Sequence, residues 1–294
     1  MGLFFSSDRF TRPGPGVRPD APRKKGVARL AEIMGRDMWN FFRAGFLAFL
    51  GCLPFIIGMF FAVETHALLF MLLAGIIGGL IAGPELSAMA DTVLRSLRDE
   101  PGYWWETYRR VWKRNARESL VPGMLTGLVL SMQIFTLFHM SVISAGIVTW
   151  VLLILSFVIT LGLESYIWPQ IALLDLPLYG ILKNSLLLFL GYLPRSLGAI
   201  AIKAVYWGAI LQFFTLTTII LPFSNFWLPM LPALLCIYQP LNKCLTIEST
   251  INKKREDHLN AALAKDNEPL PEAPPEKAEE STEASSDDSS SDVQ

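Results

Sequence analysis

Charge is scarce in this sequence, and over long stretches it is missing altogether. Charged residues make up 17% of the 294 residues and hydrophobic residues 52%, whereas a typical soluble domain carries about 25% charged residues. The scarcity is concentrated between residues 41 and 245, where long apolar runs follow one another. Uninterrupted runs of this kind argue against a soluble globular protein and indicate several membrane-spanning helices.

Several chemical signatures are also absent from the sequence. It contains no GxxxxGK[ST] phosphate-binding loop, no HExxH metal motif and no GxSxG nucleophile motif. The first absence excludes ATP binding by that loop. Without any of the three motifs, the sequence offers no catalytic constellation for an enzyme. We therefore predict no catalytic residue, no cofactor and no metal site, and we rank a membrane enzyme last among the functional alternatives.

Cysteine and histidine are represented by three residues each. Because Cys52, Cys236 and Cys244 lie in or beside apolar runs and form no CxxC pair, we expect small buried apolar groups, not disulfides or zinc ligands. His258 lies in the polar tail. His66 and His139 lie in predicted outer loops, where they share a face, but a pair of loop histidines is more often incidental than a metal site.

Six runs are long enough to cross a membrane, since a spanning helix needs about 20 mostly apolar residues. They cover residues 41–63, 67–90, 120–140, 142–163, 197–221 and 226–245. The predicted fold class is an all-α membrane protein with six transmembrane helices and cytoplasmic amphipathic helices between spans 2 and 3 and between spans 4 and 5. The predicted domains are a basic cytoplasmic segment (1–37), the six-span domain (38–250) and an acidic, largely disordered cytoplasmic tail (251–294).

The basic residues predict the orientation of these spans. All 25 Lys and Arg residues lie in the N-terminal segment and the start of the first run, in the two long loops with the start of the fifth run, or from Lys243 onward. The three remaining connections contain none. Basic residues mark the cytoplasmic side, so we predict a multi-pass protein of the cytoplasmic membrane with both termini inside.

Glycines recur every four residues in the second and third runs. The second run contains Gly75, Gly79 and Gly83, and the third contains Gly123 and Gly127. Glycine at this spacing removes side chains from one helix face and lets a neighbouring backbone approach closely. The spacing indicates packing within the bundle or, alternatively, a contact in a homo-oligomer.

Residues 91–118 combine aromatic and basic side chains. At helical spacing one face carries Trp104, Trp105, Tyr108, Val111 and Trp112, while the cations are Arg109, Arg110, Lys113, Arg114 and Arg117. This pattern is typical of a helix lying in the membrane interface, with its cations attracting anionic lipid. The alternative is a docking surface for a cytoplasmic partner. Nucleic acid is not expected as a partner, because the aromatic residues are better used as membrane anchors.

Polar side chains in or beside the apolar runs are the candidates for an intramembrane site, because they are costly in hydrocarbon. They are Asn40, Arg43, Glu85, Gln133, Glu164 and Gln212. Near the predicted cytoplasmic boundary, snorkelling to water explains Arg43 and Glu164 most simply, and a Glu85–Arg43 pair is possible because both residues lie on the inner side. The deeper Gln133 and Gln212 are expected to bond between helices or to line a polar pathway.

Four stretches together form a family pattern. They are MGLF at the start, MWNFFRAGFLAFLGCLPFIIG in the first run, YWWETYRRVWKRNARES in the first long loop and YIWPQIALLDLPLYGILKNSLLLFLGYLPRSL from the fourth run onward. In these stretches the chain resembles the YesL (DUF624) family of bacterial integral membrane proteins over about residues 1–250. It departs from the family after Pro54, where Phe55-Ile56-Ile57 replaces a segment that usually holds threonine before glycine.

Members of that family are commonly encoded beside carbohydrate ABC transporters, glycoside hydrolases and two-component regulators. The resemblance therefore implies an accessory or regulatory component of carbohydrate uptake, with the permease or ATPase subunits of an ABC transporter as partners. It brings no catalytic residue with it. The alternative is a transporter or channel for a small solute in its own right.

Overall fold

A computed structural model describes residues 23–24, 26–100, 102–141, 146–174, 176–213, 221 and 224–266. Within these ranges every regular element is a helix. The elements are α2 (Gly26–Thr65), α3 (Leu68–Leu73), the π-helical turn η1 (Ala74–Gly78), α4 (Gly79–Arg98), α5 (Trp104–Phe138), α6 (Ile147–Leu173), α7 (Leu178–Gly191), α8 (Leu193–Gln212), α10 (Trp227–Leu245) and α11 (Ile247–Asp266). The chain divides into two compact units after Glu248, and the bundle described below belongs to the first unit.

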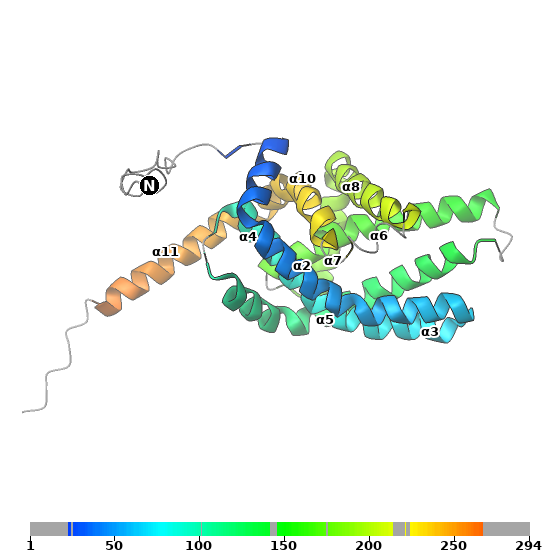
Figure 1. Cartoon of the computed structure of the whole chain (residues 1–294). Helices are drawn as coiled ribbons and strands as arrows, with labels where there is room; N and C mark the ends of the chain where they lie inside the picture. Colours follow the sequence, from blue (N-terminus) through cyan, green and yellow to red (C-terminus); the bar gives the residue numbers. More distant parts are fainter. Residues whose placement is uncertain are drawn as a thin grey trace, which may run out of the picture. The chain divides into compact units, whose positions relative to one another are not determined.

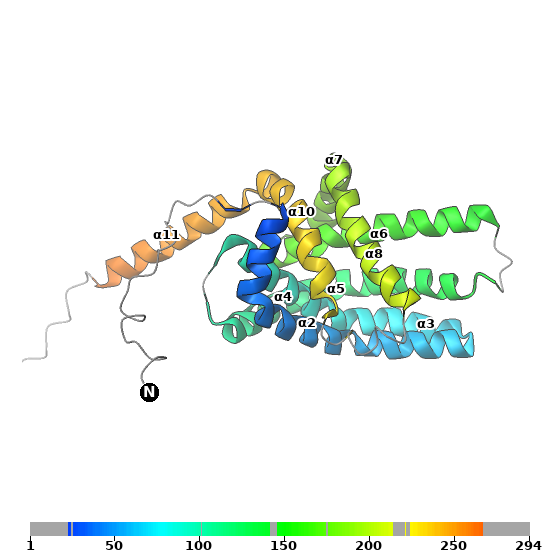
Figure 2. The same ribbon diagram turned by 45° about the horizontal axis from the view of Figure 1, so that its top comes forward.

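The long helices run back and forth between two ends of the bundle (Figure 1). At one end α4 and α6 finish while α2 and α5 begin, and we call this the charged end. At the other, α2 turns into α3, and α5 finishes where α6 begins; we call this the far end. Figure 2 shows the same arrangement from a second direction, with α8 and α10 lying across the long helices.

Four helical segments are long and apolar enough to cross a membrane: Gly26–Thr65, Leu68–Arg98, Trp104–Phe138 and Ile147–Leu173. The pair α7 and α8 makes a fifth if the two are counted as one broken span, although they meet at an angle of 100°. Large apolar side chains such as Phe60, Leu69 and Val148 are more than 60% exposed, which suits a lipid-facing surface. The architecture is therefore compatible with that of an α-helical membrane protein.

The predicted fifth and sixth spans differ from what the structure describes. Helix α8 ends at Gln212, and residues 214–220 of the fifth predicted run lie outside the described residues. The sixth run coincides with α10, which contains Pro232 and Pro240 and is not among the helices that meet the length and apolarity requirements. Six spans are therefore not confirmed.

The amphipathic segment before the third span is not a separate helix. Helix α5 continues from Trp104 to Phe138 over 35 residues, a length of about 52 Å at 1.5 Å per residue. Likewise, α2 begins at Gly26, well before the predicted first span, and extends over 40 residues. The spans therefore continue as helices through the last third of the predicted N-terminal segment and through much of the first long loop. The predicted tail also begins with helix, because α11 reaches Asp266, and residues 267–294 lie outside the described residues.

The second predicted interfacial helix corresponds to α7. It turns back along α6: Gln170 of α6 donates a hydrogen bond to Ser185 at 2.8 Å, and the ring of Phe189 lies against Gly162. Near the end of α7, Ser196 Oγ donates a hydrogen bond to the carbonyl oxygen of Phe189 at 3.2 Å. Helix α7 therefore packs into the bundle.

Helix α4 occupies the centre of the bundle and contacts α2, α5, α6 and α10. From Ser87 to Leu94 every residue is buried, as expected of a helix surrounded on all sides. This includes polar Ser87, Asp91 and Thr92. Packing around α4 therefore fixes the position of its C-terminal end at the charged end of the bundle.

The two glycine stripes lie against each other. A Cβ atom added to Gly79 would meet the carbonyl oxygen of Gly123, and one added to Gly127 would meet that of Gly75. Gly83 likewise faces the backbone of Ser119 at 2.5 Å from such an atom. In the structure these glycines serve the close approach of α4 and η1 to α5, within a single chain.

We expect Gly79→Leu to destabilise the bundle by at least about 1–3 kcal/mol, the usual cost of overpacking, because its side chain has no room beside Gly123. The measurement is the thermal unfolding midpoint of the purified chain in detergent. The matched control is Gly198→Leu in α8, where an added Cβ meets no atom within 4 Å. Equal midpoints for the two variants would contradict the proposed role of the glycine contact.

Candidate functional site at the charged end

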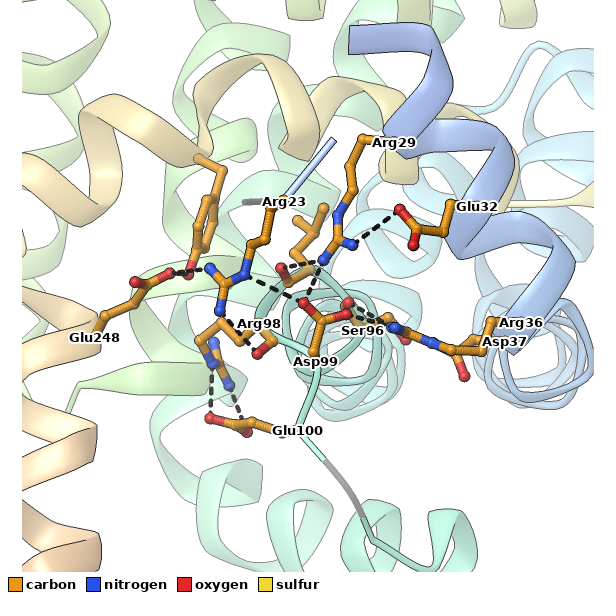
Figure 3. A network of polar contacts seen from close by, with 12 residues as sticks. Arg23, Arg29, Glu32, Arg36, Asp37, Ser96, Arg98, Asp99, Glu100 and Glu248 are labelled. Carbon is orange, nitrogen blue, oxygen red and sulfur yellow. Dashed lines mark hydrogen bonds and ion pairs between the residues drawn. The ribbon is translucent and has the colours of Figure 1, made fainter. Parts of the chain in front are cut away.

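The last carbonyl groups of a helix have no partner within that helix. At the end of α4 three arginines from the preceding part of the chain supply these partners (Figure 3). Arg36 donates to the carbonyl oxygen of Ser96 at 2.8 Å, Arg29 to that of Leu97 at 3.1 Å, and Arg23 to that of Arg98 at 3.1 Å. The positive charges also suit the negative end of the helix dipole.

The next residue, Asp99, binds the same three arginines through its carboxylate. It has a left-handed backbone with φ of 59°, which ends the helix and turns its side chain toward α2. Oδ2 lies 2.6 Å from Arg29 and 3.2 Å from Arg23, and Oδ1 bonds Arg36. Burial alone would raise the pKa of Asp99, but the hydrogen bonds and charges of Arg36 and Arg29 outweigh it, so this pKa lies below its ordinary value.

Arg23 extends the network to Glu248, the last residue of the first compact unit of the chain. Its Nη1 lies 2.8 Å from Oε1 of Glu248, which also accepts a hydrogen bond from the hydroxyl of Tyr238 at 2.7 Å. Burial opposes the charged form of Glu248, yet these two hydrogen bonds and the charge of Arg23 lower its pKa. One arginine therefore links the end of α4 to the start of α11.

A second layer of charges lies on α4 itself. Asp91 is 3% exposed and accepts a hydrogen bond of 2.6 Å from Arg95, one turn later. Arg98, 7% exposed, forms a two-pronged pair with Glu100 at 2.9 and 3.0 Å. Arg98 Nη1 is buried without a hydrogen-bond partner. Buried charges are tolerated only when paired in this way, so this end of α4 is built from mutually dependent ion pairs.

A cavity of about 290 Å³ adjoins this network between the starts of α2 and α5 and the end of α4. It is lined by Arg36, Asp37, Asn40, Thr92, Arg95, Ser96, Asp99, Glu100, Gly102, Trp104, Thr107 and Tyr108. The indole nitrogen of Trp104 is buried without a hydrogen-bond partner. The cavity thus combines paired charges, hydroxyl groups and two aromatic rings.

The aromatic residues of α5 pack partly against their own chain. Tyr108 is buried, and its hydroxyl donates to Glu85 at 2.5 Å. The indole of Trp112 donates to the other Glu85 oxygen at 2.9 Å. Trp105, by contrast, is 57% exposed. Tyr108 and Val111 of the predicted membrane-facing side are therefore buried within the chain.

The expected Glu85–Arg43 pair does not occur among the described residues. Glu85 is occupied by the two aromatic donors, and the Arg43 guanidinium lies over the rings of Trp39 and Trp104, at 5.1 and 5.7 Å from their centroids. Stacking of this kind leaves the cation partly solvated while it attracts the ring faces. Asn40, also predicted as intramembrane, lies in the lining of the cavity.

The basic residues of α5 serve different purposes. Arg114 donates to the carbonyl oxygen of Ala172 at 2.6 Å and so caps the end of α6. Arg110 pairs with Glu106 on its own helix at 2.7 Å. Arg109, Lys113 and Arg117 are exposed and have no described ion pair on their own helix, and we call these three the α5 cations.

Deeper in the bundle, Gln133 joins two helices. Its Nε2 donates to Ser156 at 2.6 Å and to Thr160 at 2.8 Å, both on α6, while its Oε1 is buried without a partner. Gln212 is exposed at the end of α8. The structure therefore does not bring these two residues to a shared pathway in the part of the chain that it describes.

Sequence reasoning misses two features of the polar network. Counting Lys203 among the cytoplasmic cations overlooks that it is 7% exposed and lies 3.9 Å from Glu164, which also accepts a hydrogen bond from Trp168. Counting Arg29 and Arg36 as solvated charge overlooks their role at the end of α4. The available signal was the helix stop after Arg98, where Glu-Pro-Gly follows the aspartate.

No family profile, curated protein or solved structure was found to match the chain.

We expect Asp99→Asn to loosen the N-terminal part of α2. The amide keeps the shape of the carboxylate but loses the ion pairs with Arg23, Arg29 and Arg36, at a cost of about 1 kcal/mol given its partial exposure. Trypsin should then cleave after Arg29 and Arg36 several times faster than in the parent. The control is Glu106→Gln, which removes an exposed pair on α5 and should leave cleavage unchanged.

Acid should reproduce the effect in the parent protein. Because the folded pKa of Asp99 is lowered, its contribution is present above pH of about 4, the ordinary value, and is lost as the pH falls further through the lowered pKa. The measurement is the rate at which an acid-stable protease cleaves the N-terminal part of α2. A rate that stays the same from neutral pH to the lowest pH at which the bundle remains folded would contradict this assignment.

Proposed function

We propose that this chain is a multi-pass protein of the bacterial cytoplasmic membrane with six spans and cytoplasmic termini. In this proposal it acts as an accessory or regulatory component of carbohydrate uptake by an ABC transporter. The observation that supports it best is the gathering of polar features at one end of the bundle. The arginine network, the cavity and the exposed α5 cations all lie there.

The positive-inside rule supports a cytoplasmic location for this end, since the basic residues of the N-terminal segment and of the first long loop meet there. A docking surface in the cytoplasm suits contact with the ATPase or with cytoplasmic loops of the permease. The type of transporter comes from the resemblance to the YesL family. The α5 cations are equally able to meet anionic lipid headgroups, and a homo-oligomer is compatible with the same surface.

The proposal predicts that a tagged chain, solubilised in mild detergent, co-purifies with the permease or ATPase of a carbohydrate transporter. Replacing Arg109, Lys113 and Arg117 together by glutamine should reduce this recovery at least several-fold, because it removes the exposed cations without touching a described ion pair.

The matched control replaces three other exposed cations by glutamine: Lys24, Lys243 and Lys253. Recovery should then equal that of the parent. If mild detergent yields neither transporter subunit with the parent chain, the accessory role is contradicted. If recovery survives replacement of the α5 cations, a docking surface elsewhere is required.

A second candidate is a transporter or channel in its own right, and one observation favours it. The buried Lys203 of α8 lies 3.9 Å from the partly buried Glu164 of α6, and α8 follows the 100° break after α7. Ionisable residues inside a membrane bundle commonly mark pathways, and broken helices commonly line binding sites in transporters.

This candidate predicts that proteoliposomes containing the chain swell in isosmotic xylose or glycerol, as followed by light scattering. Flux should fall at least several-fold in the double variant Glu164→Gln with Lys203→Met, which removes both charges together and so avoids leaving one unpaired in the bundle. Glu106→Gln is the control. Swelling no faster than that of empty liposomes with the parent chain would exclude flux of these solutes.

A further inference from the structure

The far end of the bundle brings together the two histidines of the predicted outer loops. His66 lies in the turn between α2 and α3, and His139 follows the last residue of α5. The Nδ1 atom of His66 lies 2.7 Å from Nε2 of His139, and the two rings meet edge to face. Two imidazole nitrogens from different hairpins thus point at each other.

The surroundings of His139 determine which of its nitrogens carries the proton. Its Nδ1 lies 2.8 Å from the carbonyl oxygen of Phe135, and because a carbonyl can only accept, Nδ1 must be the donor. The Nε2 lone pair of the neutral ring therefore points at His66. Stacking on Phe135, with centroids 4.0 Å apart, holds the ring in this orientation, and His139 is only 5% exposed.

This is the arrangement in which histidine binds metal. A metal-binding imidazole usually donates its second N–H to a backbone carbonyl or carboxylate, which fixes the tautomer and aims the lone pair, as Phe135 does for His139. His66 is exposed, so an ion from solution can reach it. When His66 carries its proton on Nε2, its Nδ1 lone pair converges with that of His139, and no net proton is gained or lost.

We propose that His66 and His139 form a two-histidine site for a divalent transition metal of the Zn²⁺, Ni²⁺ or Cu²⁺ type, with water completing the coordination. Bonds of about 2.0–2.1 Å in tetrahedral geometry place the two nitrogens roughly 3.3 Å apart. The rings must therefore separate by roughly 0.6 Å, a small movement for an exposed turn residue. Imidazole donors favour these metals over Mg²⁺ and Ca²⁺, which take oxygen ligands.

The site has a structural consequence. Within the described residues no group of three or more His, Cys, Asp or Glu side chains is placed to hold a metal, so binding rests on this pair and should be reversible. A bound ion would join the α2–α3 turn to the end of α5 and stabilise the far end by mass action. This role is independent of the function proposed for the charged end.

The test uses the full-length chain in detergent, titrated with Cu²⁺ and Zn²⁺ after removal of any affinity tag rich in histidine. Electron paramagnetic resonance of the Cu²⁺ complex should show two imidazole nitrogens at one equivalent per chain. Calorimetry with Zn²⁺ should show binding at least roughly tenfold weaker in His66→Gln and in His139→Gln, since each leaves a single ligand. The control, His258→Gln, changes the third histidine and should leave binding as in the parent.

Two results would overturn the site. One is a Cu²⁺ spectrum with a single nitrogen, and the other is Zn²⁺ binding that survives both substitutions or is lost only with His258→Gln. Gel filtration shows whether each variant remains folded. Should His139→Gln misfold, because that side chain is buried, His66→Gln decides the matter, since His66 is exposed.

Discussion

The C-terminal end of α4 is the constraint around which the charged end is built. A helix buried on all sides cannot leave its last carbonyl groups to water, and a bare end in the interior would cost several unsatisfied hydrogen bonds. Three arginines from α2 and the residues before it meet this need, and Asp99 neutralises them. Because these cations must reach α4, the first turns of α2 stay helical and close to it. The cavity then forms where α2, α4 and α5 meet.

The same end shows why buried charge is retained in a bundle otherwise packed through glycine and apolar side chains. An ion pair between helices such as Arg29–Asp99 contributes little net stability, because desolvation offsets much of the attraction, but breaking it leaves the buried Arg29 unpaired. Each pair therefore penalises any arrangement that separates its members. We infer that the network selects one register of α2 against α4, whereas the contact of Gly79 with Gly123 sets how closely α4 approaches α5.

The sequence predicts the helical class and the first four apolar helices because their signals are local: length, apolar content and glycine spacing. It also identifies both glycine stripes, although only the structure shows that they face each other. The partners of charged residues are not local. Arg29 and Asp99 are 70 positions apart, and nothing in either neighbourhood marks the other. For the same reason the sequence allows a Glu85–Arg43 pair, whereas in the structure Tyr108 and Trp112 reach Glu85 from α5.

The lengths of the helices connect these observations to the membrane. A hydrocarbon core of about 30 Å accommodates roughly 20 helical residues, yet α2 has 40 residues and α5 has 35. Most charged residues of α2 and of α5 lie in the first half of each helix. The helical length beyond the roughly 20 residues that cross the hydrocarbon core therefore falls at the charged end. In the proposed topology, the rigid helices there carry the cavity and the α5 cations away from the apolar band. The capping of α4 thus does more than complete one helix: it holds the extension of α2 against α4, while Tyr108 and Trp112 hold the extension of α5 to α4 through Glu85.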